Sequence, residues 1–174
     1  MKNRTETLEI GSRAPDFSLG AANREGMFTL GGLLAQGALI LEFLRGTWCP
    51  NCRKRMIHVE SRQPGIEAAG AQLAFIAAEK RDGVWKPGKF LRKHPVSSVF
   101  LLDEDRAVTR AYGLHHRFGA DAIDIAHPAT LVIDRNDIDR NDNDGGGFVR
   151  YIYRGVNQFD RAPLDEVLGA LVGH

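Results

Sequence analysis

Short apolar runs that alternate with polar, helix-forming stretches dominate the pattern of this chain. The first long apolar run, residues 38–44 (ALILEFL), has glycines near both ends, and its bulky side chains predict a buried strand. The residues from Cys52 to about Arg62 are good helix formers, and Pro64-Gly65 is expected to end that helix. The sequence therefore predicts a strand-loop-helix unit in this part of the chain.

The same alternation continues through the rest of the chain. Residues 14–30 hold two short extended pieces around a turn, which predicts an opening hairpin. The segment 115–126 is polar, and we predict no strand or helix there. Strands that alternate with helices indicate parallel pairing, and a final strand pair joined by a turn adds an antiparallel edge. The further strands are expected at residues 72–78, 97–103, 129–134 and 148–153, and the further helices at 84–94, 105–112 and 163–172.

Composition and charge narrow the possible functions. A chain of 174 residues, of which 43% are hydrophobic, can bury one core, and we expect a single domain over residues 1–174. Its 23 basic and 22 acidic side chains leave a formal charge of +1, which argues against nucleic acid or an anionic membrane as partner. The sequence has no signal-peptide core and no apolar run of about 18 residues, so we expect a soluble, cytoplasmic protein.

The only two cysteines, Cys49 and Cys52, lie in the segment Trp48-Cys49-Pro50-Asn51-Cys52. Disulfide exchange needs a thiolate that attacks and a second thiol that releases the mixed disulfide. A CxxC pair at the start of a helix supplies both, because the helix N-terminus lowers the pKa of a cysteine thiol. The sequence thus predicts a thiol-disulfide oxidoreductase in which an exposed Cys49 attacks and Cys52 resolves.

Two other interpretations of the cysteine pair stay open. A structural zinc ion needs four N or S ligands, and the adjacent His115 and His116 lack the spacing of a second ligand pair. Two cysteines can also simply pack as small apolar side chains. Either case would give a redox-inert or zinc-binding module. We expect no metal and no cofactor, and the acid-rich turn 139–145 also lacks the glycine and glutamate of a calcium loop.

Charged side chains close to the pair are candidates for tuning it. Arg53, Lys54 and Arg55 follow Cys52 and form either a cationic rim that stabilises a thiolate or a solvated helix face. Glu42 is the one charge inside the apolar run, and a buried carboxylate beneath a CxxC pair can accept the proton of the second thiol. Glu42 lies seven residues before Cys49. Side chains alternate between the two faces of a strand, so this odd spacing would turn Glu42 to the face of the sheet opposite Cys49.

Four blocks of the sequence resemble one known family in their order along the chain. They are the opening GSRAPDFSL at residues 11–19, the segment LEFLRGTWCPNC, the block LLDEDRAVTRAYGL and the strand TLVID. Together they are similar to the AhpC/TSA, or peroxiredoxin-like, family of the thioredoxin-fold superfamily. This resemblance implies an α/β fold, namely a thioredoxin-like three-layer α/β/α sandwich with a mixed central sheet and an N-terminal β-hairpin.

The sequence departs from the peroxidases of that family at three positions. If Cys52 is aligned with the peroxidatic cysteine, Cys49 stands where the family has Thr, and Arg45 stands where it has Pro. Pro128 falls where the family's peroxide-binding Arg would lie. The resemblance therefore implies disulfide exchange first, with a peroxiredoxin-like antioxidant that reduces hydroperoxides as the alternative.

Further site residues follow from the likeness to thioredoxin-type exchange proteins. Pro128 matches their cis-proline position, and His127 before it matches a residue that tunes the thiolate and could change its charge near neutral pH. Trp48 resembles the aromatic residue beside their disulfide, with Thr47 and Arg53 as further supporting residues. The implied partners are a disulfide-containing protein, a small thiol or a hydroperoxide, together with a thiol or thioredoxin-type electron donor.

Overall fold

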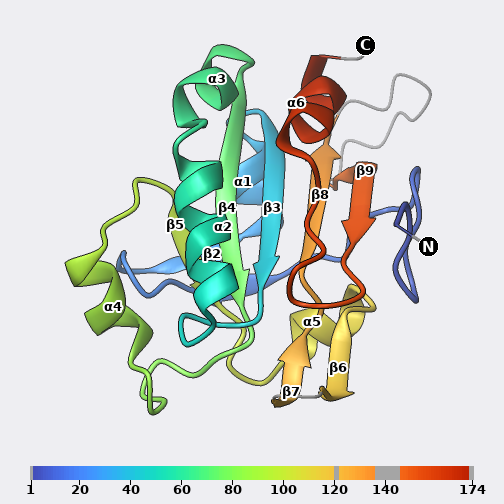
Figure 1. Cartoon of the computed structure of the whole chain (residues 1–174). Coiled ribbons are helices and arrows are strands. Elements are labelled where there is room, and N and C mark those ends of the chain that lie inside the picture. Colours follow the sequence, from blue (N-terminus) through green and yellow to red (C-terminus); the bar gives the residue numbers. More distant parts are fainter. Residues whose placement is uncertain (1, 120–121, 136–145, 173–174) are drawn as a thin grey trace.

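The centre of the fold is a mixed five-stranded sheet with the strand order β5-β4-β3-β8-β9 (Figure 1). A computed structural model describes residues 2–119, 122–135 and 146–172 of the chain. The first three strands pair in parallel, and the last two are antiparallel to β3 and to each other. The predicted mixed sheet is confirmed, with strands at β3 (Ala38–Leu44), β4 (Ala71–Ala77), β5 (Val99–Leu102), β8 (Ala129–Asp134) and β9 (Phe148–Arg154).

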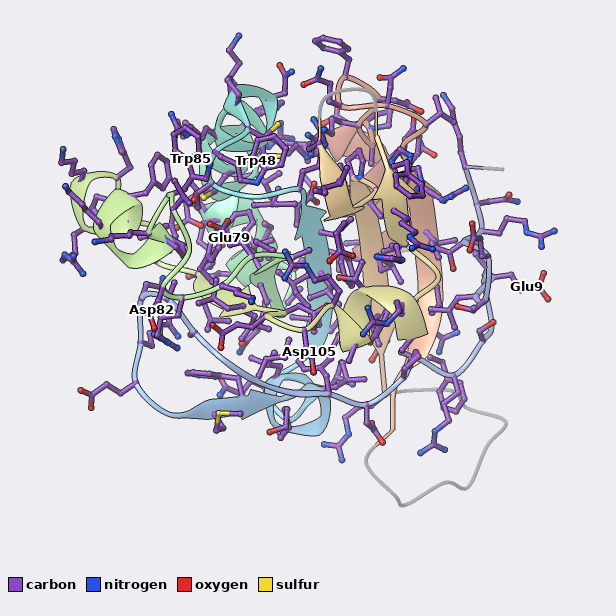
Figure 2. All side chains as sticks on the ribbon, turned by 90° about the horizontal axis from the view of Figure 1, so that it is seen from below. Glu9, Trp48, Glu79, Asp82, Trp85 and Asp105 are labelled. Atoms are coloured by element: carbon purple, nitrogen blue, oxygen red, sulfur yellow. The ribbon has the colours of Figure 1, made fainter. Side chains whose placement is uncertain are left out.

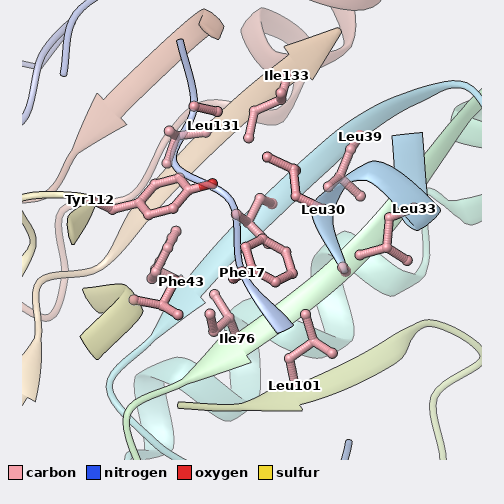
Figure 3. Close-up of a cluster of buried hydrophobic side chains, with 14 of the residues drawn as sticks. Phe17, Leu30, Leu33, Leu39, Phe43, Ile76, Leu101, Tyr112, Leu131 and Ile133 are labelled. Atoms are coloured by element: carbon pink, nitrogen blue, oxygen red, sulfur yellow. The ribbon is translucent and has the colours of Figure 1, made fainter. Parts of the chain in front are cut away.

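Helices cover both faces of this sheet, as the three-layer fold class predicted. Alternate side chains of β3 point to opposite faces, so that Leu41 and Phe43 enter one core while Ile40 and Leu44 enter the other. The first core, which also holds Tyr112, is drawn in Figure 3. It is covered by α1 (Leu30–Leu34) and α5 (Ala107–Ala111), and the second core by α2 (Pro50–Glu60), α3 (Gln63–Ala68), α4 (Pro87–Lys93) and α6 (Leu164–Val172).

The expected N-terminal hairpin is present, and a short helix that was not predicted follows it. Strands β1 (Ser18–Gly20) and β2 (Met27–Thr29) pair antiparallel. The hydroxyl of Thr29 then accepts a hydrogen bond from the backbone N–H of Gly32 and so caps the first turn of α1. Two glycines in its five residues hide this helix from a propensity-based prediction.

Two predictions about local structure were wrong. The helix expected from Cys52 to about Arg62 is present as α2, but Pro64 does not stop it, because α2 already ends at Glu60 and Pro64 stands in the first turn of α3, where a missing N–H costs nothing. The segment 115–126 is not a loop, because β6 (His115–Phe118) and β7 (Ile123–Ala126) form an antiparallel ribbon outside the main sheet. Only Ile125 and Ala126 of this ribbon are buried, so its apolar pattern is too weak to recognise.

Two other expectations concern metal and membrane. The turn 139–145, considered above for calcium, lies outside the described residues. Over the described ranges, none of the helices is long and apolar enough to cross a membrane.

Candidate active site

The CxxC pair lies at the junction between the end of β3 and the start of α2. Cys49 is the N-cap residue of α2 with an extended backbone, Pro50 is the first helical residue, and Cys52 follows in the first turn. Both side chains are buried, with 0% of Cys49 and 1% of Cys52 exposed. The predicted place of Cys52 is confirmed, whereas the expectation of an exposed Cys49 is wrong, because both sulfurs are part of the core between α2 and the sheet.

Hydrogen bonds and charge shift the pKa values of the two cysteines in opposite directions. A hydrogen bond from the Cys52 side chain, the backbone N–H groups of Cys52 and Asn51, and the charge of Arg45 together lower the pKa of Cys49 to about 5, against the opposing effect of burial. The same hydrogen bond and burial raise the pKa of Cys52. At neutral pH, Cys49 is therefore a thiolate and Cys52 a thiol that donates to it.

Two arginines that the sequence analysis did not assign to the sulfurs contact them. The Nη1 atom of Arg45 lies 3.7 Å from the Sγ atom of Cys49, and the backbone N–H of Arg45 donates to the Sγ atom of Cys52 at 3.3 Å. The Nη2 atom of Arg161 lies 3.2 Å from the same Cys52 sulfur. The pair therefore has a guanidinium group on each sulfur, although Pro128 occupies the position expected for the family's arginine.

The connection between β9 and α6 holds part of this arrangement in place. The Oε1 atom of Gln158 accepts hydrogen bonds from Nη1 of Arg45 at 3.2 Å and from Nδ2 of Asn51 at 3.0 Å. Arg161 is on the same connection, which comes more than 100 residues after the pair in the sequence. No local motif marks Gln158 or Arg161, so only the folded chain reveals them.

The predicted cationic rim after Cys52 is only partly present. Arg55 is buried, and its Nε atom lies 2.6 Å from Oε1 of Glu42. The Oε2 atom of Glu42 also accepts a hydrogen bond from the hydroxyl of Thr130 at 2.7 Å. Glu42 does face the same core as the cysteines, yet its contacts are with Arg55 and Thr130. The structure thus pairs Glu42 with Arg55, and its expected role as proton acceptor stays a prediction.

The residues around Trp48 are held by a carboxylate that the sequence analysis missed. Buried Glu79 accepts hydrogen bonds from the backbone N–H of Thr47 at 2.6 Å and from its hydroxyl at 2.8 Å. Burial raises the pKa of Glu79. The guanidinium group of Arg53 donates to the Thr47 carbonyl and lies 4.8 Å from the Phe90 ring, so this expected supporting residue contacts the loop before Cys49.

Trp48 packs onto the connection between β3 and α2, next to Cys49 and Cys52. Its ring is half-buried and stacks under the guanidinium group of Arg45, with 5.0 Å between the Cζ atom and the ring centre. The indole also lies so close to Gly46 that a Cβ atom there would be 2.2 Å from its Nε1 atom. Trp48 is thus placed beside the dithiol, as the resemblance implied, and Gly46 is what permits the close approach.

His127 and Pro128 lie near the pair without the properties that the resemblance implied. No peptide bond in the described part of the chain is cis, so the bond before Pro128 is trans. His127 stacks on His116 with 4.3 Å between ring centres. Burial, with smaller effects from Arg154 and His116, lowers the pKa of His127 to about 4. The expectation that His127 changes its charge near neutral pH is therefore wrong, and the ring is neutral there.

Fold and site together define a thioredoxin-fold protein with a buried CxxC dithiol at the N-terminus of the helix after β3. Comparison with known families gives the more specific assignment. The chain belongs to the Redoxin family, which matches residues 9–145. No curated protein matches the chain by sequence. Within the residues that the structure describes, no group of three or more His, Cys, Asp or Glu side chains is placed to hold a metal ion.

Solved structures with the same fold include a peroxidoxin, a peroxiredoxin-like protein and a putative thiol:disulfide interchange protein. Peroxidoxin BcpB from Mycobacterium tuberculosis is 20% identical with a TM-score of 0.76, and the match covers 94% of this chain and 96% of that one. A putative thiol:disulfide interchange protein DsbE from Chlorobium tepidum is 25% identical with a TM-score of 0.68, covering 94% and 99%. A peroxiredoxin-like protein from Aquifex aeolicus is 18% identical with a TM-score of 0.73, covering 94% and 86%. Family and fold support a thiol oxidoreductase or a thiol peroxidase.

Proposed function

We propose that this protein is a thiol-disulfide oxidoreductase that uses Cys49 and Cys52 to reduce or exchange disulfides. The observation that carries this proposal is the unequal pair, in which Cys49 at the N-cap of α2 receives a hydrogen bond from Cys52 and the charge of Arg45. Exchange needs one thiolate that attacks and one thiol kept in reserve, and this arrangement supplies both at neutral pH.

The reaction is a two-electron transfer between the dithiol and a disulfide. The Cys49 thiolate attacks one sulfur of the substrate, so that a mixed disulfide forms and the substrate S–S bond breaks, releasing a thiolate that takes up a proton. Cys52 then loses its proton and attacks the Cys49 sulfur, which releases the second substrate thiol. The protein ends with a Cys49–Cys52 disulfide and the substrate with two thiols, and an external dithiol donor restores the reduced protein.

The proposal includes the partners and the setting expected from the sequence. The substrate is a protein disulfide or a small disulfide, and the electron donor is a thiol or a protein of the thioredoxin type. We further propose that residues 1–174 act as one domain in the cytoplasm. A bound metal or cofactor plays no part in this reaction.

Reduction of a small disulfide tests the proposal. The reduced protein, mixed with hydroxyethyl disulfide, should release mercaptoethanol and lose two hydrogens by mass spectrometry as Cys49 and Cys52 join. Dithiothreitol should reverse this loss of mass, and Cys49→Ser should abolish the reaction. Stoichiometric zinc in the purified protein, or oxidation that yields only intermolecular dimers, would contradict it and favour the zinc-binding or redox-inert module.

A thiol peroxidase is the second candidate, because both sulfurs have a guanidinium neighbour. In that reaction Cys52 attacks a hydroperoxide, the O–O bond breaks to release water or an alcohol, and the resulting sulfenic acid condenses with Cys49 to a disulfide and water. Arg161 at 3.2 Å from Cys52 could stabilise the attacking thiolate. The raised pKa of Cys52 disfavours this order of events. Rapid peroxide consumption by the reduced protein would favour it.

A further inference from the structure

A polar pocket lies between α2 and the connection from β9 to α6, and it has a volume of about 310 Å³. Asn51, Lys54 and His58 line it from α2. They are three and four residues apart in the sequence, so they lie on one face of the helix. Phe159 and Arg161 line the pocket from the connection. The pocket thus lies between the helix that carries the cysteine pair and the segment that supplies an arginine to it.

Positive charge dominates the lining of this pocket. Arg55 also lines it, but its charge is offset by the ion pair with Glu42. The described residues that line the pocket include no Asp and no Glu. Figure 2 labels acidic residues in other parts of the chain, and none of them lines the pocket: Glu9, Glu79, Asp82 and Asp105. Lys54 and Arg161 therefore meet no carboxylate on the walls of the pocket.

Lys54 differs from the two cations beside it in the sequence. Arg53 donates to the Thr47 carbonyl, and Arg55 pairs with Glu42. Lys54 is exposed, and within the described part of the chain no ion pair joins it to a carboxylate. It also lies near the N-terminus of α2, where the helix dipole favours a negative charge over a positive one. An anion in the pocket would supply that negative charge.

Arg161 has hydrogen-bonding capacity that the protein does not use. Its Nη2 atom lies 3.2 Å from the Sγ atom of Cys52, and its Nε atom donates to the carbonyl of Gln158 at 3.1 Å. Its Nη1 atom is buried and has no hydrogen-bond partner among the described residues. A buried donor without an acceptor is unfavourable. An anion whose oxygen reaches this guanidinium group from the pocket would provide the missing acceptor.

We propose that this pocket is a binding site for a phosphate group, held between Lys54 and Arg161 with Asn51 and His58 beside it. A phosphate group carries close to two negative charges at neutral pH, and its oxygens accept hydrogen bonds from several directions, for which arginine and lysine are the usual partners. A carboxylate has one charge and two oxygens. The inference goes beyond the proposed function and does not depend on it, because no sulfur takes part in the binding.

Calorimetric titration of inorganic phosphate into the reduced full-length protein, at constant pH and ionic strength, tests the site. Binding should saturate at one phosphate per chain, and Lys54→Gln and Arg161→Gln should each weaken it about tenfold. Lys93→Gln removes an exposed lysine outside the pocket, so it changes the net charge equally and should leave the affinity unchanged. Because Lys54 is exposed, its variant is expected to fold normally and keeps the test valid if Arg161→Gln does not fold.

Two further probes define the ligand. Acetate should bind about tenfold more weakly than inorganic phosphate. Phe159 lines the pocket and is 73% exposed, so its ring can pack against the organic part of a phosphorylated molecule. Phenyl phosphate that binds more tightly than inorganic phosphate, with the gain lost in Phe159→Ala, would identify a small phosphorylated molecule as the ligand. Equal affinities of the two phosphates would identify free phosphate.

The contrary outcomes are separate from a failure of the proposed function. Phosphate binding that does not saturate, losses that are equal for Lys54→Gln and Lys93→Gln, or acetate that binds as tightly as phosphate would each overturn the site. A protein that fails to reduce hydroxyethyl disulfide while it binds phosphate as described would refute the proposed function and leave the phosphate site standing.

Discussion

Arg45 contacts both sulfurs, Cys49 through its side chain and Cys52 through its backbone. Because its positive charge favours the thiolate, Arg45→Gln should raise the pKa of Cys49 by about one unit. The rate of iodoacetamide alkylation against pH measures this. In the wild type the rate should stay nearly constant as the pH falls from 9 toward 6, and then drop as the pH passes through the lowered pKa of about 5.

Arg53 provides the matched control for that experiment. Its guanidinium group lies over the Phe90 ring and donates to the Thr47 carbonyl. Arg53→Gln should therefore leave the alkylation curve almost unchanged. A curve that moves with Arg53→Gln but not with Arg45→Gln would mean that the run of cations after Cys52 tunes the thiolate after all.

The buried ion pair of Glu42 and Arg55 should stabilise the fold without tuning the chemistry. Glu42→Gln leaves a buried guanidinium group without its counter-charge, and this should lower the free energy of unfolding by roughly 3–5 kcal/mol. Urea denaturation measures the loss. The double variant Glu42→Leu/Arg55→Met removes both charges and should be less destabilised than Glu42→Gln. If Glu42→Gln instead slowed disulfide exchange at unchanged stability, Glu42 would be the proton acceptor after all.

Sequence analysis could find the residues of the site that a local motif marks. Cys49, Cys52 and Trp48 follow one another in a recognisable segment, and the structure places all three at the start of α2. Glu79 and Arg161 were missed because their roles depend on contacts across 32 and 109 residues of sequence. Nothing in their own neighbourhoods distinguishes a buried or sulfur-bound charge from the other charged residues of the chain.

The connection between β3 and α2 is the element that shapes the site. Thr47 is fixed by Glu79, and Trp48 packs onto Gly46. Gly46→Ala places a Cβ atom within 2.2 Å of the Trp48 Nε1 atom, so the indole must move away and lose its contact with Arg45. We expect a shift in tryptophan fluorescence and a fall of about tenfold in kcat/KM for hydroxyethyl disulfide.

Gly169 provides the control for Gly46→Ala, because there is open space around it. A Cβ atom at Gly169 of α6 meets no atom within 4 Å, and alanine favours a helix, so Gly169→Ala should keep full activity and unfold at slightly higher urea. If Gly46→Ala kept wild-type fluorescence and activity, the close packing of Trp48 against Gly46 would not be needed for disulfide exchange.

Among the elements, those with a strong apolar pattern were predicted and those without one were not. The strand at residues 38–44 was predicted with its observed bounds because it is buried on both faces and all of its positions except Glu42 are apolar. The strands β6 and β7 have exposed residues at half of their positions, so the segment shows no clear alternation of apolar and polar residues.

At the scale of the whole molecule, the site is assembled from segments that the fold brings together. The end of β3, the start of α2 and the connection after β9 meet around two sulfurs with almost no exposed surface. Resemblance to a known family predicted the layers and the sheet, because these follow from strand and helix order. Burial of Cys49 could not be predicted, since the core that holds both sulfurs also includes residues from distant parts of the chain, such as Tyr153 and Ala162.

The central claim is that Cys49 attacks and Cys52 resolves, and mass spectrometry of two single variants after reaction with hydroxyethyl disulfide tests it most directly. Cys52→Ser keeps a hydroxyl beside the attacking thiolate but cannot release the adduct, so it should accumulate a mixed disulfide at residue 49. Cys49→Ser should stay unmodified over the same time. A mixed disulfide that forms only on Cys52, or a sulfenic acid confined to Cys52 after treatment with hydrogen peroxide, would reverse the roles and contradict the account.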